Sequence, residues 1–260
     1  MSEPRVALVT GAARGIGAAT AVLLADQGLR VVALDSCEGD GGRAGYPLAT
    51  PADLERTGDV LGDRGITLQA DVCDPAALRH AVACAVEEWG RLDVAVAAAA
   101  VIGGGVPLWQ DTSLAAQWEV DVVGVWNTAA AAVPEMLTGP DPAGCRFVAV
   151  ASAAGTRGLF HLAAYTTVKH AVVGLVRGLA ADLVGTGVTA AAVAPGGTRT
   201  AMLDATAALY GVTASDLAPA QLLQDLLDPR EVAATIAFAC SREGRVLNGS
   251  VVHADGGFVG

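Results

Sequence analysis

RVALVTGAARGIG, residues 5–17, joins a short apolar run to a glycine-rich turn and the start of a second apolar segment. An apolar run without strict alternation is typical of a strand that is buried on both faces of a parallel sheet. In the turn, Gly11 permits a tight bend, Gly15 lets the backbone approach a phosphate, and Gly17 allows close helix–strand packing. The free N–H groups and the dipole of the following helix favour a pyrophosphate there. The stretch therefore predicts a dinucleotide-binding strand–turn–helix unit.

Predicted strands and helices alternate along the rest of the chain. Further apolar runs occupy residues 30–35, 66–71, 92–98, 146–152, 188–194 and 249–254. Helical segments are predicted between them, at residues 16–27, 75–89, 114–136, 163–184 and 229–240. Strands that alternate with helices over the full length predict an α/β fold. We expect a single domain over residues 1–260, with a Rossmann-like doubly wound parallel sheet of about seven strands and helices on both faces.

Two long excursions interrupt this rhythm. An insertion is predicted at about residues 36–61, and a lid at about residues 195–228. Both begin at the carboxyl ends of strands, where sheets of this type bind ligands. Long segments at that edge are usually binding loops or lids.

Composition excludes several classes of protein. Sixteen Lys and Arg residues against 27 Asp and Glu give a net charge of −11, which argues against binding to nucleic acid or to an anionic membrane surface. No apolar run approaches the ~18 residues of a transmembrane helix, and MSEPRVALVTG enters a strand without a leader, so we expect a cytoplasmic protein. Five scattered cysteines without a C-x-x-C pair predict no metal site.

Acidic residues follow the second and third apolar runs. Asp35 lies at the distance expected for a carboxylate that binds the ribose hydroxyls of adenosine. Because a carboxylate repels a 2′-phosphate, NAD is favoured over NADP. Asp71 and Val72 could address adenine through a side chain and a backbone N–H.

Candidate catalytic residues follow the run at 146–152. Ser152 closes that run, and Tyr165 and Lys169 lie four residues apart on one face of the next predicted helix. Lys169 is the only lysine in a chain with 15 arginines. Free tyrosine titrates near pH ~10, and a nearby ammonium lowers that value by stabilising the phenolate. This arrangement predicts proton transfer by Tyr165 during hydride transfer to or from a carbonyl carbon, with Ser152 bonding the substrate oxygen.

The ordered motifs resemble the short-chain dehydrogenase/reductase family over essentially the whole chain. They are TGAARGIG, Asp35, Asp71-Val72, Ser152, YTTVK (165–169), PGGTRT (195–200) and DGG (255–257). The resemblance implies a homotetramer with Tyr165 as the acid/base and Lys169 holding the nicotinamide ribose. It also implies that NAD contacts Gly11, Ala13, Arg14, Gly15, Ile16, Gly17, Asp35, Ser36, Asp71, Val72, Ala98, Ala99, Tyr165, Lys169, Pro195, Gly196, Thr198 and Thr200.

Within that family, the insertion DSCEGDGGRAGYPLATPADL is similar to that of the mycofactocin-coupled dehydrogenases, as are the segments RTAMLDATAALYG and VVHADGGF. This resemblance implies an NAD that does not exchange and that passes its electrons to mycofactocin, a peptide-derived redox cofactor. An insertion beside Asp35 could cover the adenosine half of NAD and slow its dissociation. An ordinary surface loop is the alternative.

Three departures from the family pattern stand out. The N-N-A-G motif is replaced by four alanines at 97–100, Ala194 replaces the Asn before Pro-Gly, and Asp121 stands in the place of the catalytic Asn. Loss of the first Asn predicts weaker local support beside the cofactor. In the family, the main-chain carbonyl of the catalytic Asn holds a water molecule that links the lysine to solvent and relays protons. We expect this relay to persist, because a side-chain change leaves the carbonyl in place. An ionised Asp121 would in addition favour the charged form of Lys169.

The sequence thus predicts an NAD-dependent dehydrogenase for a hydrophobic secondary alcohol or its ketone. The substrate pocket is expected to include residues 152–161, Trp109, and lid side chains Met202, Leu203, Leu209 and Tyr210. The alternatives are an ordinary carbonyl reductase with exchangeable NAD(H) and a catalytically silent NAD-binding protein.

Overall fold

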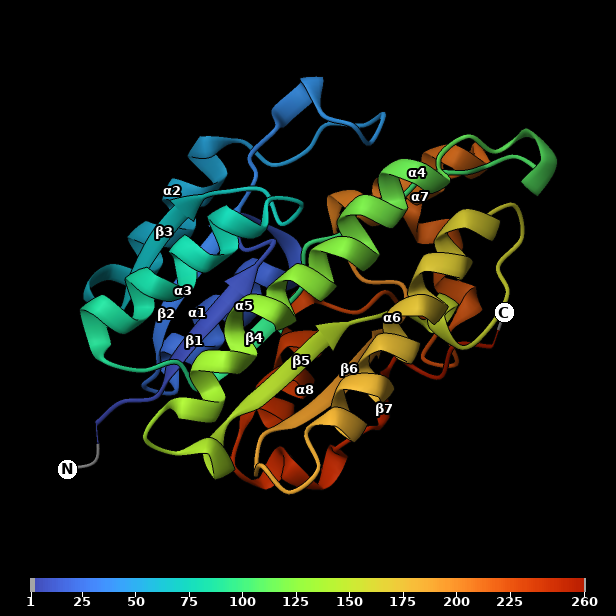
Figure 1. The fold of residues 1–260 in the computed structure, drawn as a ribbon. Coiled ribbons are helices and arrows are strands. Elements are labelled where there is room, and N and C mark those ends of the chain that lie inside the picture. Colours follow the sequence, from blue (N-terminus) through green and yellow to red (C-terminus); the bar gives the residue numbers. More distant parts are fainter. Residues whose placement is uncertain (1–2, 260) are drawn as a thin grey trace.

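The computed structural model describes residues 3–259, which form one parallel sheet between two helical layers (Figure 1). The sheet has the strand order β3-β2-β1-β4-β5-β6-β7. The strands are β1 (Val6–Thr10), β2 (Arg30–Asp35), β3 (Gly65–Gln69), β4 (Val94–Ala97), β5 (Arg146–Val150), β6 (Thr189–Pro195) and β7 (Val251–Ala254). The larger helices are α1 (Gly15–Asp26), α2 (Pro51–Leu61), α3 (Pro75–Trp89), α5 (Gly124–Thr138), α6 (Ala163–Asp182), α7 (Ala201–Tyr210) and α8 (Pro229–Cys240). The predicted doubly wound sheet of seven strands is confirmed.

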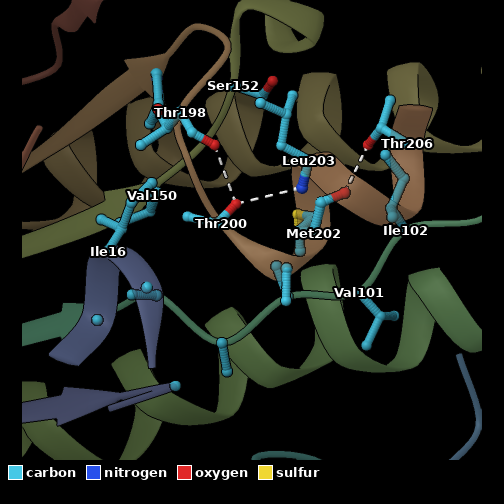
Figure 2. A pocket seen from close by; sticks show the side chains of 18 of the residues that line it. Ile16, Val101, Ile102, Val150, Ser152, Thr198, Thr200, Met202, Leu203 and Thr206 are labelled. Atoms are coloured by element: carbon cyan, nitrogen blue, oxygen red, sulfur yellow. Dashed lines mark hydrogen bonds between the residues drawn. The ribbon is translucent and has the colours of Figure 1, made fainter. Parts of the chain in front are cut away.

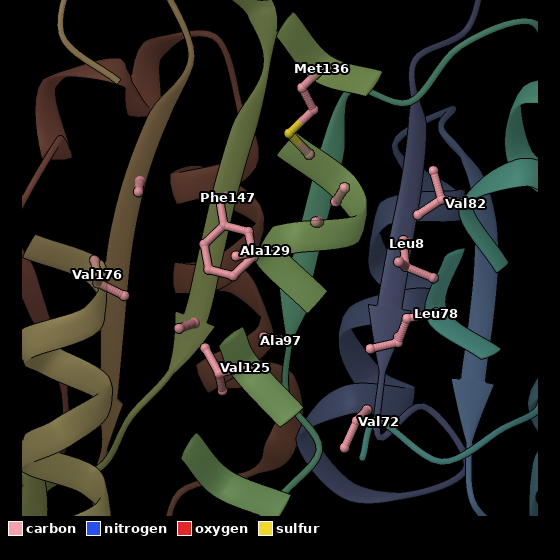
Figure 3. Close-up of a cluster of buried hydrophobic side chains, with 14 of the residues drawn as sticks. Leu8, Val72, Leu78, Val82, Ala97, Val125, Ala129, Met136, Phe147 and Val176 are labelled. Carbon is pink, nitrogen blue, oxygen red and sulfur yellow. The ribbon is translucent and has the colours of Figure 1, made fainter. Parts of the chain in front are cut away.

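Each face of the sheet has its own apolar core. Helices α3, α5 and α6 cover one face, where Phe147 of β5 packs among Val125, Ala129 and Met136 (Figure 3). Helices α1, α2 and α8 cover the other face. The five inner strands are hydrophobic on both sides because both of their faces are buried, which explains their continuous apolar runs. The edge strands β3 and β7 are only partly buried.

The segment predicted as an insertion at 36–61 divides into two parts. Its second half is α2, the crossover helix between β2 and β3. Thr50 caps this helix in a capping box with Asp53, and Pro51 occupies the first turn. The irregular insertion is therefore shorter, residues 36–50, and it rises beyond the sheet as the blue loop in Figure 1.

The predicted helix at 114–136 is interrupted by a wider turn. Helix α4 (Leu114–Gln117) leads into a π-helical segment, Trp118–Val123, before α5 begins. Such π segments are rare and occur frequently at functional sites. Asp121 lies in this segment and is completely buried.

The predicted lid at 195–228 contains α7 and a 3-10 helix, Ala214–Ala220. No helix among residues 3–259 is long and apolar enough to cross a membrane.

Candidate active site

A cavity of about 740 Å³ lies at the carboxyl ends of the strands. It brings together nearly all positions for which the sequence predicts a role. Its lining includes Gly11, Arg14, Gly15, Ile16, Gly17, Asp35, Ser36, Asp71, Val72, Ala98, Ala99, Ser152, Tyr165, Lys169, Pro195, Gly196, Thr198 and Thr200. Ala13 and Asp121 are buried just behind this surface. The predicted cofactor and catalytic residues thus share one cavity.

The glycine turn has the geometry that a phosphate cradle needs. Helix α1 begins at Gly15, so its free N–H groups face the cavity. A Cβ atom at Gly17 would lie 2.0 Å from the carbonyl oxygen of Gly11, which no side chain could tolerate. The backbone around α1 therefore fits a pyrophosphate group.

Two carboxylates stand at the end of the cavity where the sequence predicts that adenosine binds. The Oδ2 atom of Asp35 accepts a hydrogen bond from the Ala13 N–H at 3.1 Å, and its Oδ1 accepts one from the Cys37 N–H at 3.1 Å. These bonds fix the carboxylate at the end of β2, where it can meet ribose hydroxyls. Asp71 accepts a bond from the Cys73 N–H at 2.8 Å, which contributes to lowering its pKa against the opposing effect of burial.

The insertion is tied to this end of the cavity by Arg43. Its guanidinium forms ion pairs with Asp71 and with Glu38, the latter at 2.8 Å. On the other side of the loop, Arg14 donates a hydrogen bond to the carbonyl of Pro47 at 2.9 Å. The insertion is therefore attached both to the segment after β3 and to the glycine turn.

Tyr46, at the tip of the insertion, reaches the catalytic end of the cavity. It lines the cavity and packs against an apolar cluster that includes Leu162 and Tyr165. Burial raises its pKa to about 12. The sequence did not predict a role for Tyr46. The one feature that could have indicated it is the presence of an aromatic residue within a glycine-rich segment.

The three candidate catalytic side chains converge at the end of β5 and on α6. The Nζ atom of Lys169 lies 5.5 Å from the ring centroid of Tyr165 and 3.4 Å from the carbonyl oxygen of Val150. Tyr165 is 8% exposed and Lys169 only 2%. Ser152 caps the short helix Ala153–Gly155, and its hydroxyl lowers the pKa of Tyr165 by hydrogen bonding. The arrangement can transfer a proton to or from a group in the cavity.

The pKa of Tyr165 is raised above its ordinary value. Burial is the main cause, and the Asp121 carboxylate adds to it, while the Lys169 ammonium opposes both. The prediction that the ammonium lowers the pKa is correct as a single contribution. The ammonium alone does not lower the pKa of Tyr165 below its ordinary value, because the side chain is buried and the Asp121 carboxylate has the opposite effect.

Asp121 makes direct contact with Lys169. Its Oδ2 atom lies 3.0 Å from Nζ, and its Oδ1 accepts a hydrogen bond from the Val101 N–H at 2.8 Å. The Asp121 side chain thus bridges Lys169 and the segment after β4.

Thr10 supports the same segment in place of the missing asparagine. Its Oγ1 atom accepts hydrogen bonds from the N–H groups of Ala98 and Ala99, at 3.1 and 3.2 Å. Thr10 thus bonds the alanine segment itself, and Asp121 bonds Val101 directly after it. The expectation that support is weaker than an Asn would give stays a prediction. The sequence feature that could have indicated this support is the threonine hydroxyl at the end of β1.

The lid forms the apolar end of the cavity. Thr200 caps α7 by accepting a hydrogen bond from the Leu203 N–H at 3.3 Å (Figure 2). Met202 and Leu203, in the first turn of this helix, line the cavity, and the Met202 sulfur lies 4.0 Å from Oη of Tyr165. The predicted contribution of Trp109 is wrong: this side chain is 80% exposed and lies outside the cavity lining. The loop after β4 is irregular, so periodicity could not show its direction.

Comparisons with known proteins agree with this architecture. A profile described as "Enoyl-(Acyl carrier protein) reductase" matches residues 11–259. The 3beta-hydroxysteroid dehydrogenase of Mediterraneibacter gnavus is 32% identical over 98% of this chain and 95% of its own. The (-)-trans-carveol dehydrogenase of Rhodococcus erythropolis is 40% identical over 70% of this chain and 66% of its own. The crystal structure of carveol dehydrogenase from Mycobacterium avium in complex with NAD superposes with a TM-score of 0.90 at 33% identity, covering 98% and 97% of the two chains.

Proposed function

Because this chain belongs to the short-chain dehydrogenase/reductase family, we propose that it transfers a hydride between NAD and a hydrophobic secondary alcohol or its ketone. The observation that carries this proposal is the single cavity in which Asp35 faces one end and Ser152, Tyr165 and Lys169 meet at the other. The apolar lid and the NAD-bound carveol dehydrogenase neighbour both support the proposed substrate class.

The chain's own residues supply binding and proton transfer. The turn at 11–17 would hold the pyrophosphate, and Asp35 the adenosine ribose, where its charge disfavours a 2′-phosphate. Bound NAD would supply the hydride acceptor. Tyr165 would take the proton of the alcohol at its Oη atom, Ser152 would bond the substrate oxygen, and Lys169 would hold the nicotinamide ribose.

We also propose that NAD is held between turnovers and is reoxidised by mycofactocin. The resemblance of the insertion supports this assignment, as does its attachment across the adenosine end of the cavity through Arg43 and Arg14. The remaining expectations are a cytoplasmic location and a homotetramer. Exposed tryptophans at 118 and 126, 42% and 65% accessible, offer apolar surface for assembly.

A single preparation tests these assignments. The purified protein is expected to release stoichiometric NAD on denaturation and to oxidise alicyclic or steroid alcohols with an artificial electron acceptor but not with added NAD alone. Turnover with added NAD would instead identify an ordinary reductase with exchangeable cofactor. Bound NAD without turnover under either condition would identify a silent binding protein. Sizing of the same preparation in solution would contradict the tetramer if it gave a monomer.

Replacement of Arg43 tests the role of the insertion. Arg43→Ala removes the ion pair that attaches the loop to Asp71, together with the pair to Glu38 within the loop, each partner being about one-third exposed or less. Since the attaching pair is worth about 0–1 kcal/mol, we expect NAD release to accelerate by up to roughly fivefold. Dissociation can be followed after dilution into excess labelled NAD.

Arg56→Ala is the matched control, because Arg56 pairs with Asp53 on α2 and does not line the cavity. Equal release rates in the Arg43 variant and the wild type would show that the insertion does not retain NAD.

A further inference from the structure

Asp121 and Lys169 form a buried pair of opposite charges. The catalytic roles described above require the lysine but not the carboxylate. Asp121 is 0% exposed and Lys169 2% exposed, and their charged atoms lie 3.0 Å apart. Among residues 3–259, no other group donates a hydrogen bond to the Oδ2 atom of Asp121. That oxygen therefore depends on the ammonium alone.

The other carboxylate oxygen is used structurally. Oδ1 accepts the hydrogen bond from the Val101 N–H, a role that an amide oxygen could fill equally well. Asp and Asn therefore differ at this position only in the second atom of the group. Asp has Oδ2, which carries half of the negative charge, where Asn would have a neutral NH₂ group. Electrostatics, and not backbone support, distinguishes this side chain.

We propose that Asp121 is a positioning residue that anchors the Lys169 ammonium by a direct ion pair and offsets the action of that ammonium on Tyr165. The inference rests on the acid–base role of Tyr165 in the proposed function. It extends that role because Asp121, together with Lys169, determines the electrostatic field at Tyr165.

The direction of the effect follows from the charges that face Tyr165. Lys169 on α6 stabilises the phenolate, whereas Asp121 on the π-helical segment destabilises it. Tyr46, on the insertion, is the third titratable neighbour and stays neutral, since burial raises its own pKa to about 12. Burial lowers the pKa of Lys169 but Asp121 raises it, and burial raises the pKa of Asp121 while Lys169 opposes that rise. The direct contact at 3.0 Å favours the charged forms of both groups. A neutral residue at 121 would leave that ammonium free to act on Tyr165 alone.

Asp121→Asn therefore tests the proposal. Alcohol oxidation needs Tyr165 as a base, so its rate rises with pH through the apparent pKa of the tyrosine. Removal of a nearby negative charge is expected to move this midpoint down by about one pH unit. The variant should remain folded and active, because Asn keeps the acceptor for Val101.

A second readout does not depend on turnover. The chain has three tyrosines, so the phenolate absorbance of each protein minus that of its Tyr165→Phe counterpart isolates Tyr165. This titration should show the same downward shift in Asp121→Asn. If neither protein oxidises an alcohol, the proposed function fails while the titration still decides the role of Asp121.

Asp93→Asn is the matched control. Asp93 is also buried, at 1% exposure, but pairs with Arg91 beside the start of β4 and lies outside the cavity lining. It should leave the midpoint of Tyr165 unchanged. An unmoved or raised midpoint in Asp121→Asn would overturn the proposal. If that variant does not fold, Asp121→Ser provides a shorter neutral side chain for the same two measurements, judged by the same shift.

Discussion

Tyr165→Phe is expected to lower the rate of alcohol oxidation by about 10²–10⁴-fold, the usual contribution of a general acid–base group. The substitution removes the proton-carrying Oη atom and leaves the ring in its apolar cluster with Leu162 and Val168. Because the contacts of Oη are a distant one with Met202, at 4.0 Å, and a hydrogen bond with the Ser152 hydroxyl, loss of packing should be small. Stopped-flow measurement of hydride transfer, beside NAD content and thermal unfolding, checks this result.

Tyr210→Phe separates chemistry from pocket shape. Tyr210 also contributes to the cavity, but its hydroxyl donates to the carbonyl of Phe160 at 2.6 Å and so supports the lid. We expect this variant to change KM more than the chemical step. Activity of Tyr165→Phe within about threefold of wild type, far below the acid–base range, would remove Tyr165 from its assigned role.

The second large effect concerns stability. Lys169→Met leaves the buried Asp121 carboxylate without its partner, and the loss of one member of a buried pair typically costs about 3–5 kcal/mol. The double variant Lys169→Met/Asp121→Asn removes both charges and should recover most of this loss. It should nevertheless remain inactive, because no ammonium is left beside Tyr165.

Chemical denaturation of the two single variants and the double variant gives the coupling energy between the residues. Arg56→Met serves as the reference for a solvent-exposed pair with Asp53, for which about 0–1 kcal/mol is expected. Equal stability of Lys169→Met and wild type would mean that Asp121 is uncharged in the folded protein, contrary to the ion pair inferred above.

The sequence predicted most of the fold because its five inner strands are buried on both faces. Continuous apolar runs marked all seven strands, with boundary differences of at most two residues. Helix α2 was absorbed into the predicted insertion, since its buried face is small and consists of Leu54, Thr57 and Leu61. Its signals were local, a capping residue at Thr50 and a proline at 51.

The sequence predicted those parts of the candidate site that depend on residues within a single helix or at the end of a single strand. Spacing alone brought Tyr165 and Lys169 to one helix face, and Asp35 to the end of a strand. Contacts between distant segments were not predictable in this way. The reach of Tyr46 into the catalytic end and the support of Ala98 by Thr10 depend on loop paths that have no periodicity.

Burial of Lys169 has a chemical consequence for the whole molecule. It is the only lysine of the chain, and its Nζ lies inside the cavity beneath Tyr165, 2% exposed and paired with a carboxylate. All other cationic side chains are guanidinium groups, which do not react as amines. Acylating reagents and amine-directed crosslinkers therefore find no lysine side chain on the described surface. Acylation of Lys169 by such a reagent would measure how often the active site opens.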